Sequence, residues 1–281
     1  MTPSTRAFFL TGLLALAGAA ILHFLVLWGL AVVWYPAIHL TIFGWITAMI
    51  LGVNYHTVPV FAARDFPYPW LGKAHWVTFT GGIALTTGAL LVGSPVGTAA
   101  GIILEITAAL LFTANTLLLF LRGPQRPHRP PAPPIPIQPA IDRISTMATK
   151  GAGLSLPLAL VLLLAVYRGW LGATWILAAE HLAVLGWVML MIAGVAYHVL
   201  PRFSGRSVRG LNWARAQLLC HYGALALMVP SLGFGWTSVF AVGGVLMTLA
   251  VGLFAWTVWP ALSIVRPRQG LVQVSFKEAR R

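Results

Sequence analysis

The sequence predicts an all-α integral membrane protein with eight transmembrane helices, arranged as two parallel four-helix repeats with both termini cytoplasmic. Three observations support this: a low charge content, eight long apolar runs and an internal repeat. Of the 281 residues, 59% are apolar and 8% charged, whereas soluble domains carry about 25% charged residues. A spanning helix needs about 20 apolar residues. The predicted helices cover residues 7–32, 36–62, 70–93, 97–121, 146–168, 173–200, 212–232 and 236–262.

The chain divides into two membrane units. The first unit, residues 1–122, begins with a helix that lacks a small-residue cleavage site before a soluble domain, so it is interpreted as a retained helix rather than a signal peptide. A cytoplasmic linker, residues 123–143, follows with eight prolines, which cannot continue a helix and favour a polyproline-like spacer. The second unit covers residues 144–265, and residues 266–281 form a basic cytoplasmic tail.

Basic residues predict the orientation of the helices. They concentrate before the first helix, in alternate connections and in the tail, whereas Arg168 is the exception in the other connections. This positive-inside distribution places both termini in the cytoplasm of a multi-pass protein, in a bacterial-type inner (cytoplasmic) membrane. The net charge of +13 therefore reflects topology and attraction to anionic lipid rather than nucleic-acid binding.

The internal repeat relates helices two and six. The segment HLTIFGWITAMILGVNYHTVPVF begins at His39, and HLAVLGWVMLMIAGVAYHVLPRF begins at His181. These 23-residue segments lie 142 positions apart and match at twelve places, and the same offset pairs Gly81 with Gly223 in the next helix. Since each unit has an even number of helices, the repeat is parallel.

Each repeated segment begins with one histidine and carries a second toward its other end. The helix between the two rises about 25 Å, so His39 and His181 are expected near the outer boundary and His56 and His198 near the inner one. In each repeated segment, four residues are spaced by steps of four and three, which predicts that they share one helical face. A neighbouring helix or a flat ring can approach that face closely at its glycine. The sets are Trp45, Met49, Gly52 and His56, and Trp187, Met191, Gly194 and His198.

Two further histidines lie in the helices that follow. His75 begins helix three, at the expected depth of His56, and His221 lies one turn deeper than Gln217, the position that matches His75. Neutral imidazole is the usual axial ligand of b-type haem and also binds copper. The candidate cofactor ligands are therefore His39, His181, His56, His198, His75 and His221. Alternatively, boundary histidines only hydrogen-bond headgroups or loop backbone, and Trp, Met and Gly are ordinary packing residues.

Acidic residues within the predicted helices are scarce. Glu105 in helix four and Glu180 beside His181 are candidates for proton transfer or for orienting a ligand. Cys220 is the only cysteine, which excludes an internal disulfide, and no Cys-x-x-Cys-His motif exists for covalent c-type haem. A phosphate loop and a nucleophile elbow are also absent, so a kinase or a conventional hydrolase has no support.

The pattern H-x2-V-x-G-W…G-x-x-Y-H-x-L-P-R-x-x-G-R at 181–206, read with 39–61, resembles the catalytic subunit of haem–copper oxidases. It is most similar to the cbb3-type oxidases, their nitric oxide reductase relatives and the NnrS-type membrane proteins. The resemblance implies an axial histidine of a low-spin haem at His39 and a copper ligand at His181. This chain lacks the family's later helices and its adjacent His-His pair, so a complete oxidase site is not implied.

These observations favour a membrane protein that binds haem b, and copper as a second metal, at His39 and His181. It would act in electron transfer or in the response to nitric oxide or oxygen, with a redox donor and either partner membrane subunits or a second copy. Whether it is an oxidoreductase stays open. The alternatives are a transporter or metal-handling permease, which duplication and intramembrane His and Glu also fit, and a cofactor-free structural subunit of a respiratory complex.

Overall fold

The computed structural model describes residues 2–125 and 136–262, and these ranges are helical apart from their connections. Some of these elements follow one another without a break and form a single continuous helical rod. The elements of the first half are α1 (Pro3–Leu27), η1 (Ala31–Val33), α2 (Trp34–His39), η2 (Leu40–Ile46), α3 (Thr47–Ala62), α4 (Pro69–Leu91) and α5 (Pro95–Arg122). Those of the second half are α6 (Gln138–Tyr167), α7 (Thr174–His181), η3 (Leu182–Met189), α8 (Leu190–Ser204), α9 (Leu211–Phe234) and α10 (Thr237–Leu262).

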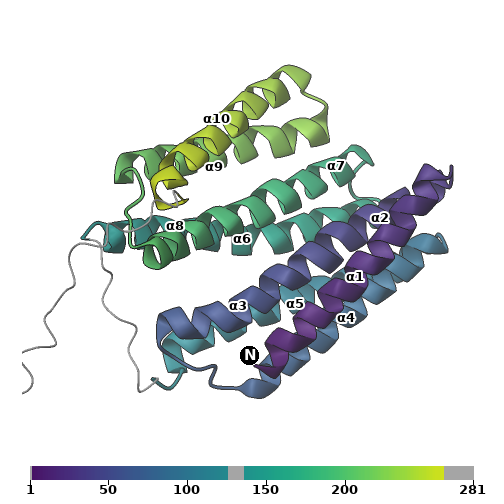
Figure 1. Cartoon of the computed structure of the whole chain (residues 1–281). Coiled ribbons are helices and arrows are strands. Elements are labelled where there is room, and N and C mark those ends of the chain that lie inside the picture. The colour runs from purple at the N-terminus through teal and green to yellow at the C-terminus, as the bar shows by residue number, and fades with distance from the viewer. Residues whose placement is uncertain (1, 126–135, 263–281) are drawn as a thin grey trace, which may run out of the picture.

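Eight helical rods correspond to the eight predicted runs within the described residues, since η1 to α3 form one rod and α7 to α8 another. Seven of these rods are long and apolar enough to cross a membrane, which confirms an α-helical, multi-pass membrane protein. The exception is α4, whose 23 residues include Lys73, His75 and several threonines. It runs beside α5 in the same bundle (Figure 1).

The connections gather at two ends of the bundle (Figure 1). The end that holds the loops 63–68 and 205–210 and the start of α1 is called the basic end, because Arg64, Arg206 and Arg209 lie there. The loops after α1, α4, α6 and α9 lie at the opposite end. The two ends thus carry the charge difference that the sequence predicts for two membrane faces.

The linker is shorter than predicted, because α6 begins at Gln138 rather than at 146. Residues 138–143, assigned to the linker from its prolines, form the first turns of α6. Pro139 is tolerated there because the first turn of a helix needs no backbone donor. Residues 126–135 of the linker and the tail 266–281 lie outside the described residues.

Glycines bring the helices of each half close together. A Cβ on Gly52 would lie 2.9 Å from Phe9 of α1, and one on Gly194 would lie 3.1 Å from the backbone nitrogen of Thr149 in α6. These two glycines occupy equivalent positions of the internal repeat, and each faces the first helix of its own half. Small residues permit such close approach in membrane bundles, where association depends on packing.

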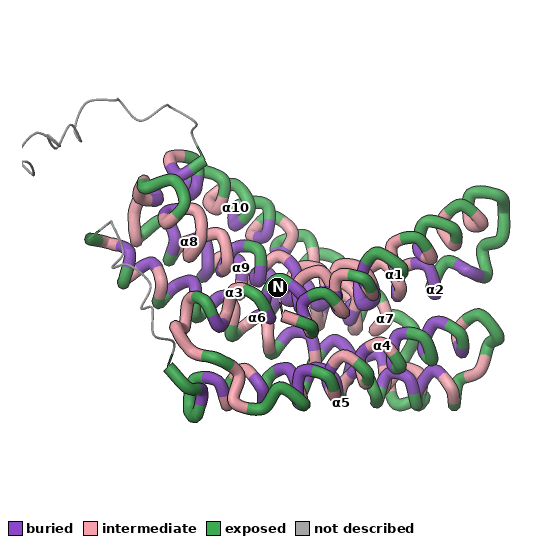
Figure 2. Tube along the Cα trace, turned by 60° about the horizontal axis from the view of Figure 1, so that its bottom comes forward, coloured by how far each residue is buried: buried purple, intermediate pink, exposed green. Residues whose placement is uncertain are grey.

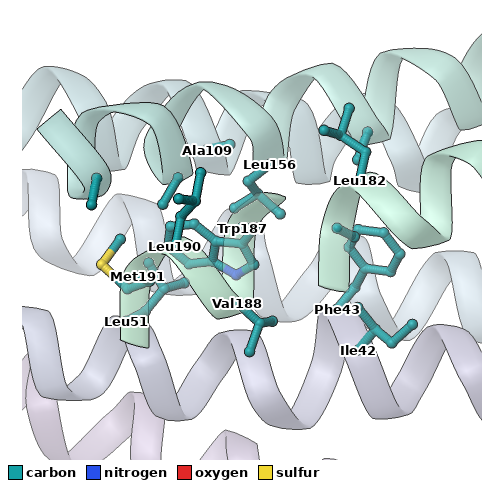
Figure 3. Close-up of a cluster of buried hydrophobic side chains, with 14 of the residues drawn as sticks. Ile42, Phe43, Leu51, Ala109, Leu156, Leu182, Trp187, Val188, Leu190 and Met191 are labelled. Atoms are coloured by element: carbon teal, nitrogen blue, oxygen red, sulfur yellow. The ribbon is translucent and has the colours of Figure 1, made fainter. Parts of the chain in front are cut away.

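An apolar core fills the space between the two halves. Figure 2 shows the buried positions along the middle of the bundle and the exposed ones on its outside. Figure 3 shows the centre, where Trp187 lies among side chains from both halves, including Leu51 and Leu156. Trp187 is fully buried, and its indole Nε1 donates to Thr47 Oγ1 at 3.0 Å. The halves are therefore joined by packing and by a hydrogen bond that crosses between them.

Candidate functional site

The first histidine of each repeated segment stands directly before a π-helical segment. His39 precedes η2, and His181 precedes η3. The π-helix is rare and occurs frequently at functional sites. Because its turn is wider, it also shifts the faces expected from steps of three and four. Within α3, Gly52 and Tyr55 are buried and His56 is exposed, so the face predicted to include both Gly52 and His56 is wrong at His56.

A buried polar cluster joins three elements of the first half. Nε2 of His39, at the end of α2, lies 3.0 Å from Oε1 of Glu105 in α5. Thr86 of α4 donates its hydroxyl to the same oxygen at 2.5 Å. The side chains are almost inaccessible, with 6% of His39 and 3% of Glu105 exposed. The second carboxylate oxygen, Oε2, has no hydrogen-bond partner among the described residues.

A second buried cluster lies nearer the basic end. Asn115 of α5 donates to the hydroxyl oxygen of Tyr55 at 3.2 Å. The Tyr55 oxygen lies 2.9 Å from Nδ1 of His75, a residue of α4 that is 0% exposed. Nε2 of His75, like Oε2 of Glu105, is a buried polar atom without a partner in the described part of the chain.

Two small cavities lie beside these clusters. The first is lined by His75 and Glu105 together, with Thr47 and apolar side chains of α3, α5 and α6, and has room for about one water molecule. The second lies toward the opposite end and is lined by His39, Thr86 and Glu180. Glu105 thus lines the first cavity, and its partners His39 and Thr86 line the second.

The second half has no equivalent acidic cluster among its described residues. At the offset of the internal repeat, the positions equivalent to Glu105, Thr86 and His75 are Met247, Met228 and Gln217. Tyr197 donates to Oε1 of Gln217 at 3.3 Å, as Tyr55 pairs with His75 in the first half. The tyrosine contact is retained, while Glu105 and His75 are exchanged for neutral residues and only His39 keeps a titratable equivalent, His181.

His181 and His221 make backbone contacts instead. Nδ1 of His181 lies 2.9 Å from the carbonyl oxygen of Leu177, and the ring is edge-on to Phe240 at 6.0 Å. An Nδ1–H donated to that carbonyl leaves a lone pair on Nε2, the arrangement of many metal-binding histidines. Nε2 of His221 lies 2.9 Å from the carbonyl oxygen of Leu185.

His198 belongs to a charged cluster at the basic end. Its Nδ1 lies 3.0 Å from Asp142 of α6. Arg202 forms two hydrogen bonds with the same carboxylate, at 2.9 and 2.7 Å. Phe61 of α3 lies against both, with its ring centroid 4.3 Å from that of His198. This arrangement ties α6 to α8 and brings the end of α3 against them.

The predicted ligands do not converge on one centre. Within residues 2–125 and 136–262, no group of three or more His, Cys, Asp or Glu side chains is arranged to hold a metal ion. Nε2 of His39 is bound to Glu105, and its ring stacks on Phe43 at 4.9 Å. The small cavity beside His39 has room for water but not for a porphyrin. His181 keeps a nitrogen available for a ligand.

Sequence reasoning selected Glu105, Glu180, His39 and His75 but missed their partners. Tyr55, Thr86 and Asn115 complete the two clusters. Tyr55 carried a signal, because it belongs to the repeated Tyr-His pair; the histidine was selected and the tyrosine is the one that faces inward. Threonine and asparagine in apolar runs carry only a weak signal, since both also bond to their own helix.

No protein-family model matches the chain, and no curated protein matches it. A function must therefore be inferred from the polar clusters, the cavities beside them and the membrane setting of the helices.

Proposed function

We propose that this chain is a multi-pass membrane protein that transfers protons through its first four-helix half, with His39 and Glu105 as the protonatable centre. This corresponds to the transporter class expected above as an alternative. The observation that carries the proposal is the Glu105 carboxylate. One of its oxygens is hydrogen-bonded to His39 and Thr86, and the other has no partner in the described chain.

The depth of Glu105 supports a functional role. It lies ten residues into α5, which places it about 15 Å from the start of that helix. An ionisable group at mid-membrane is costly and is usually retained for ion or proton transfer. An imidazole and a carboxylate 3.0 Å apart can share one proton between them, so the singly protonated pair holds no unpaired buried charge.

The same proposal includes the membrane topology. All eight rods cross the bilayer as two parallel four-helix repeats, with the basic end and both termini in the cytoplasm. Arg64, Arg206 and Arg209 at one end support this orientation. The matching contacts of Gly52 and Gly194 support the repeat.

Proton flux into liposomes tests the function. Purified protein would be reconstituted with a pH-sensitive dye inside, and a potassium diffusion potential would drive protons inward. Glu105→Gln is expected to lower the flux about tenfold or more, whereas Met247→Leu, at the equivalent position of the second half, leaves it unchanged. Flux of the Glu105→Gln protein equal to that of the wild type would overturn the proposal.

A second candidate function is a haem or copper site on His181, serving electron transfer or a response to nitric oxide or oxygen. The hydrogen bond from its Nδ1 to Leu177 favours this, because it leaves Nε2 free to bind a metal. Partner subunits or a second copy of the chain would then supply the remaining ligands, and a redox donor would supply the electrons. Haem would contribute reversible one-electron chemistry.

The reduced-minus-oxidised spectrum of the purified protein, with iron and copper analysis, tests this candidate. A b-type α-band that is lost in His181→Ala and kept in His56→Ala would support it. A flat spectrum together with less than stoichiometric iron and copper would overturn it.

A further inference from the structure

The rod that carries His39 changes its helical form between the two polar clusters. His39 ends α2, the seven residues of η2 follow as a π-helix, and Tyr55 lies beyond them in α3. Thr47 stands at the junction of η2 and α3. We propose that Thr47 is a positioning residue, which keeps η2 π-helical and so keeps His39 on Glu105. This inference rests on the proposed function and adds a residue that acts on the protonatable pair from outside it.

The π-helix determines which face of the rod each cluster residue occupies. Tyr55 follows His39 by 16 residues. At 3.6 residues per turn, an unbroken α-helix would place two such residues about 160° apart, on nearly opposite faces. A π-helix has more residues per turn, since its hydrogen bonds run to i+5, so η2 removes rotation on the order of 100°. The two side chains are thereby brought toward one face of the rod.

The contacts of both residues agree with this rotation. Nε2 of His39 lies 3.0 Å from Oε1 of Glu105 in α5. The hydroxyl oxygen of Tyr55 lies 2.9 Å from His75 of α4 and 3.2 Å from Asn115 of α5. His39 and Tyr55 are 6% and 2% exposed, so both are buried against the same pair of helices. A rod that was α-helical throughout would turn one of the two away from α4 and α5.

Thr47 closes the last turn of η2 with its backbone and with its side chain. Its backbone N–H reaches the carbonyl oxygens of Gly44 and Ile42, and its hydroxyl donates to the Ile42 oxygen at 2.9 Å. The hydroxyl oxygen also accepts Nε1–H of Trp187, from the π-helical segment of the other half, at 3.0 Å. Thr47 and Trp187 are 1% and 0% exposed, and hydrogen bonds are stronger in such a buried setting. Because π-helical turns are rare in α-helical rods, we expect η2 to depend on these bonds.

The π-helix of the second half is also bonded by a side chain, but from a different position. The residue equivalent to Thr47 is Met189, which has no hydroxyl. Instead, the carbonyl oxygen of Leu185 within η3 accepts Nε2–H of His221 from α9 at 2.9 Å. Met189 is therefore a matched control position, since it occupies the same place in the repeat without the same bond.

Removal of the hydroxyl tests the inference. In Thr47→Val the side chain keeps its shape but loses both side-chain bonds, so η2 is expected to relax toward an α-helix and His39 to turn away from Glu105. Proton flux in the liposome assay should then fall about tenfold, because small misplacements of reacting groups have effects of this size or larger. Thr47→Ser retains the hydroxyl and should keep most of the flux. Met189→Leu should leave it unchanged.

A spectroscopic measurement separates positioning from a general loss of stability. The infrared bands of the Glu105 side chain, identified by their loss in Glu105→Gln, report its hydrogen bond with His39. These bands should shift in Thr47→Val and stay unchanged in Thr47→Ser. In His39→Gln protein, Thr47→Val should no longer shift them, whereas a loosened fold would shift them in either background.

The outcomes separate the two proposals. Wild-type flux in Thr47→Val, with loss in Glu105→Gln, would overturn the role of Thr47 and leave Glu105 as the centre. Wild-type flux in Glu105→Gln would overturn the proposed function, and unchanged Glu105 bands in Thr47→Val would overturn the positioning role whether or not protons are transferred.

A second variant decides the matter should Thr47→Val be poorly folded. Trp187→Phe removes the donor to Thr47 and leaves the bond from Thr47 to Ile42. Its control is Trp45→Phe, at the equivalent and only partly buried position. Trp187→Phe should lower the flux and shift the Glu105 bands, and Trp45→Phe should do neither. Equal flux and equal bands in these two proteins would overturn the inference.

Discussion

The two halves of this protein place different chemistry on similar helix contacts. Gly101 of α5 lies against Thr86, and Gly243 of α10 lies against Met228. These pairs occupy equivalent positions of the internal repeat, and each allows two neighbouring helices to approach closely. Beside the first pair is Glu105, whereas the equivalent residue in the second half, Met247, is a buried thioether.

The comparison teaches that the packing of a four-helix unit can be kept while its polar centre is lost. The second half still contributes to the site, because Leu156 and Leu160 of α6 line the first cavity and Trp187 donates a hydrogen bond to Thr47. The polar centre of the first half is therefore shielded from lipid by the apolar centre of the second. Water exclusion of this kind strengthens the hydrogen bonds around Glu105.

The largest expected effect comes from placing the acid in the wrong half. Met247→Glu is expected to lower the free energy of unfolding by about 3 kcal/mol, because the position equivalent to Thr86 is Met228 and has no hydroxyl to donate, while His181, equivalent to His39, uses Nδ1 for the Leu177 carbonyl. Adding Met228→Thr should recover about 1 kcal/mol through one new hydrogen bond. Denaturant titration in detergent, followed by tryptophan fluorescence, measures both. Wild-type stability of Met247→Glu would show that the second half already accommodates an acid.

An intermediate effect is expected at the two matched glycines. In Gly101→Ala the new Cβ would lie 2.5 Å from the backbone nitrogen of Thr86, while in Gly243→Ala it meets the flexible side chain of Met228. The first substitution should cost about 2–3 kcal/mol of unfolding free energy and the second about 1 kcal/mol. Gly101→Ala should also reduce proton flux, since it displaces Thr86 from Glu105. Equal costs in the two variants would contradict this difference between the halves.

The smallest effect compares the two inner histidines. His198→Ala removes the contact with Asp142 and should cost about 0.5–1 kcal/mol, a value typical of partly exposed ion pairs that salt weakens. His56 is exposed, so His56→Ala should leave stability unchanged at any salt concentration. Thermal unfolding in low and high salt checks this pair. A larger loss for His56→Ala would indicate a partner on its exposed face.

The prediction of the fold succeeded where it depended on composition and failed where it depended on turns. Each of the eight apolar runs became a helical rod, since any span of that length must satisfy its backbone internally in lipid. The predicted start of α6 was wrong by about two turns, because the effect of Pro139 depends on its place within the helix. The hydrophobic periodicity of the sequence did not distinguish the π-helical segments from ordinary α-helix.

The sequence by itself determined the membrane class, the helical rods, the repeated histidine segments and the scarcity of acids, because each follows from residue type and spacing along the chain. Only the tertiary structure decided which polar groups meet. His39 and Glu105 are far apart in the sequence, and their contact depends on how α2 packs on α4 and how α4 and α5 approach each other at Gly82 and Gly101. The burial of Tyr55 rather than His56 was likewise decided in three dimensions, because it depends on which face of α3 packs against Phe8 of α1 and Phe112 of α5.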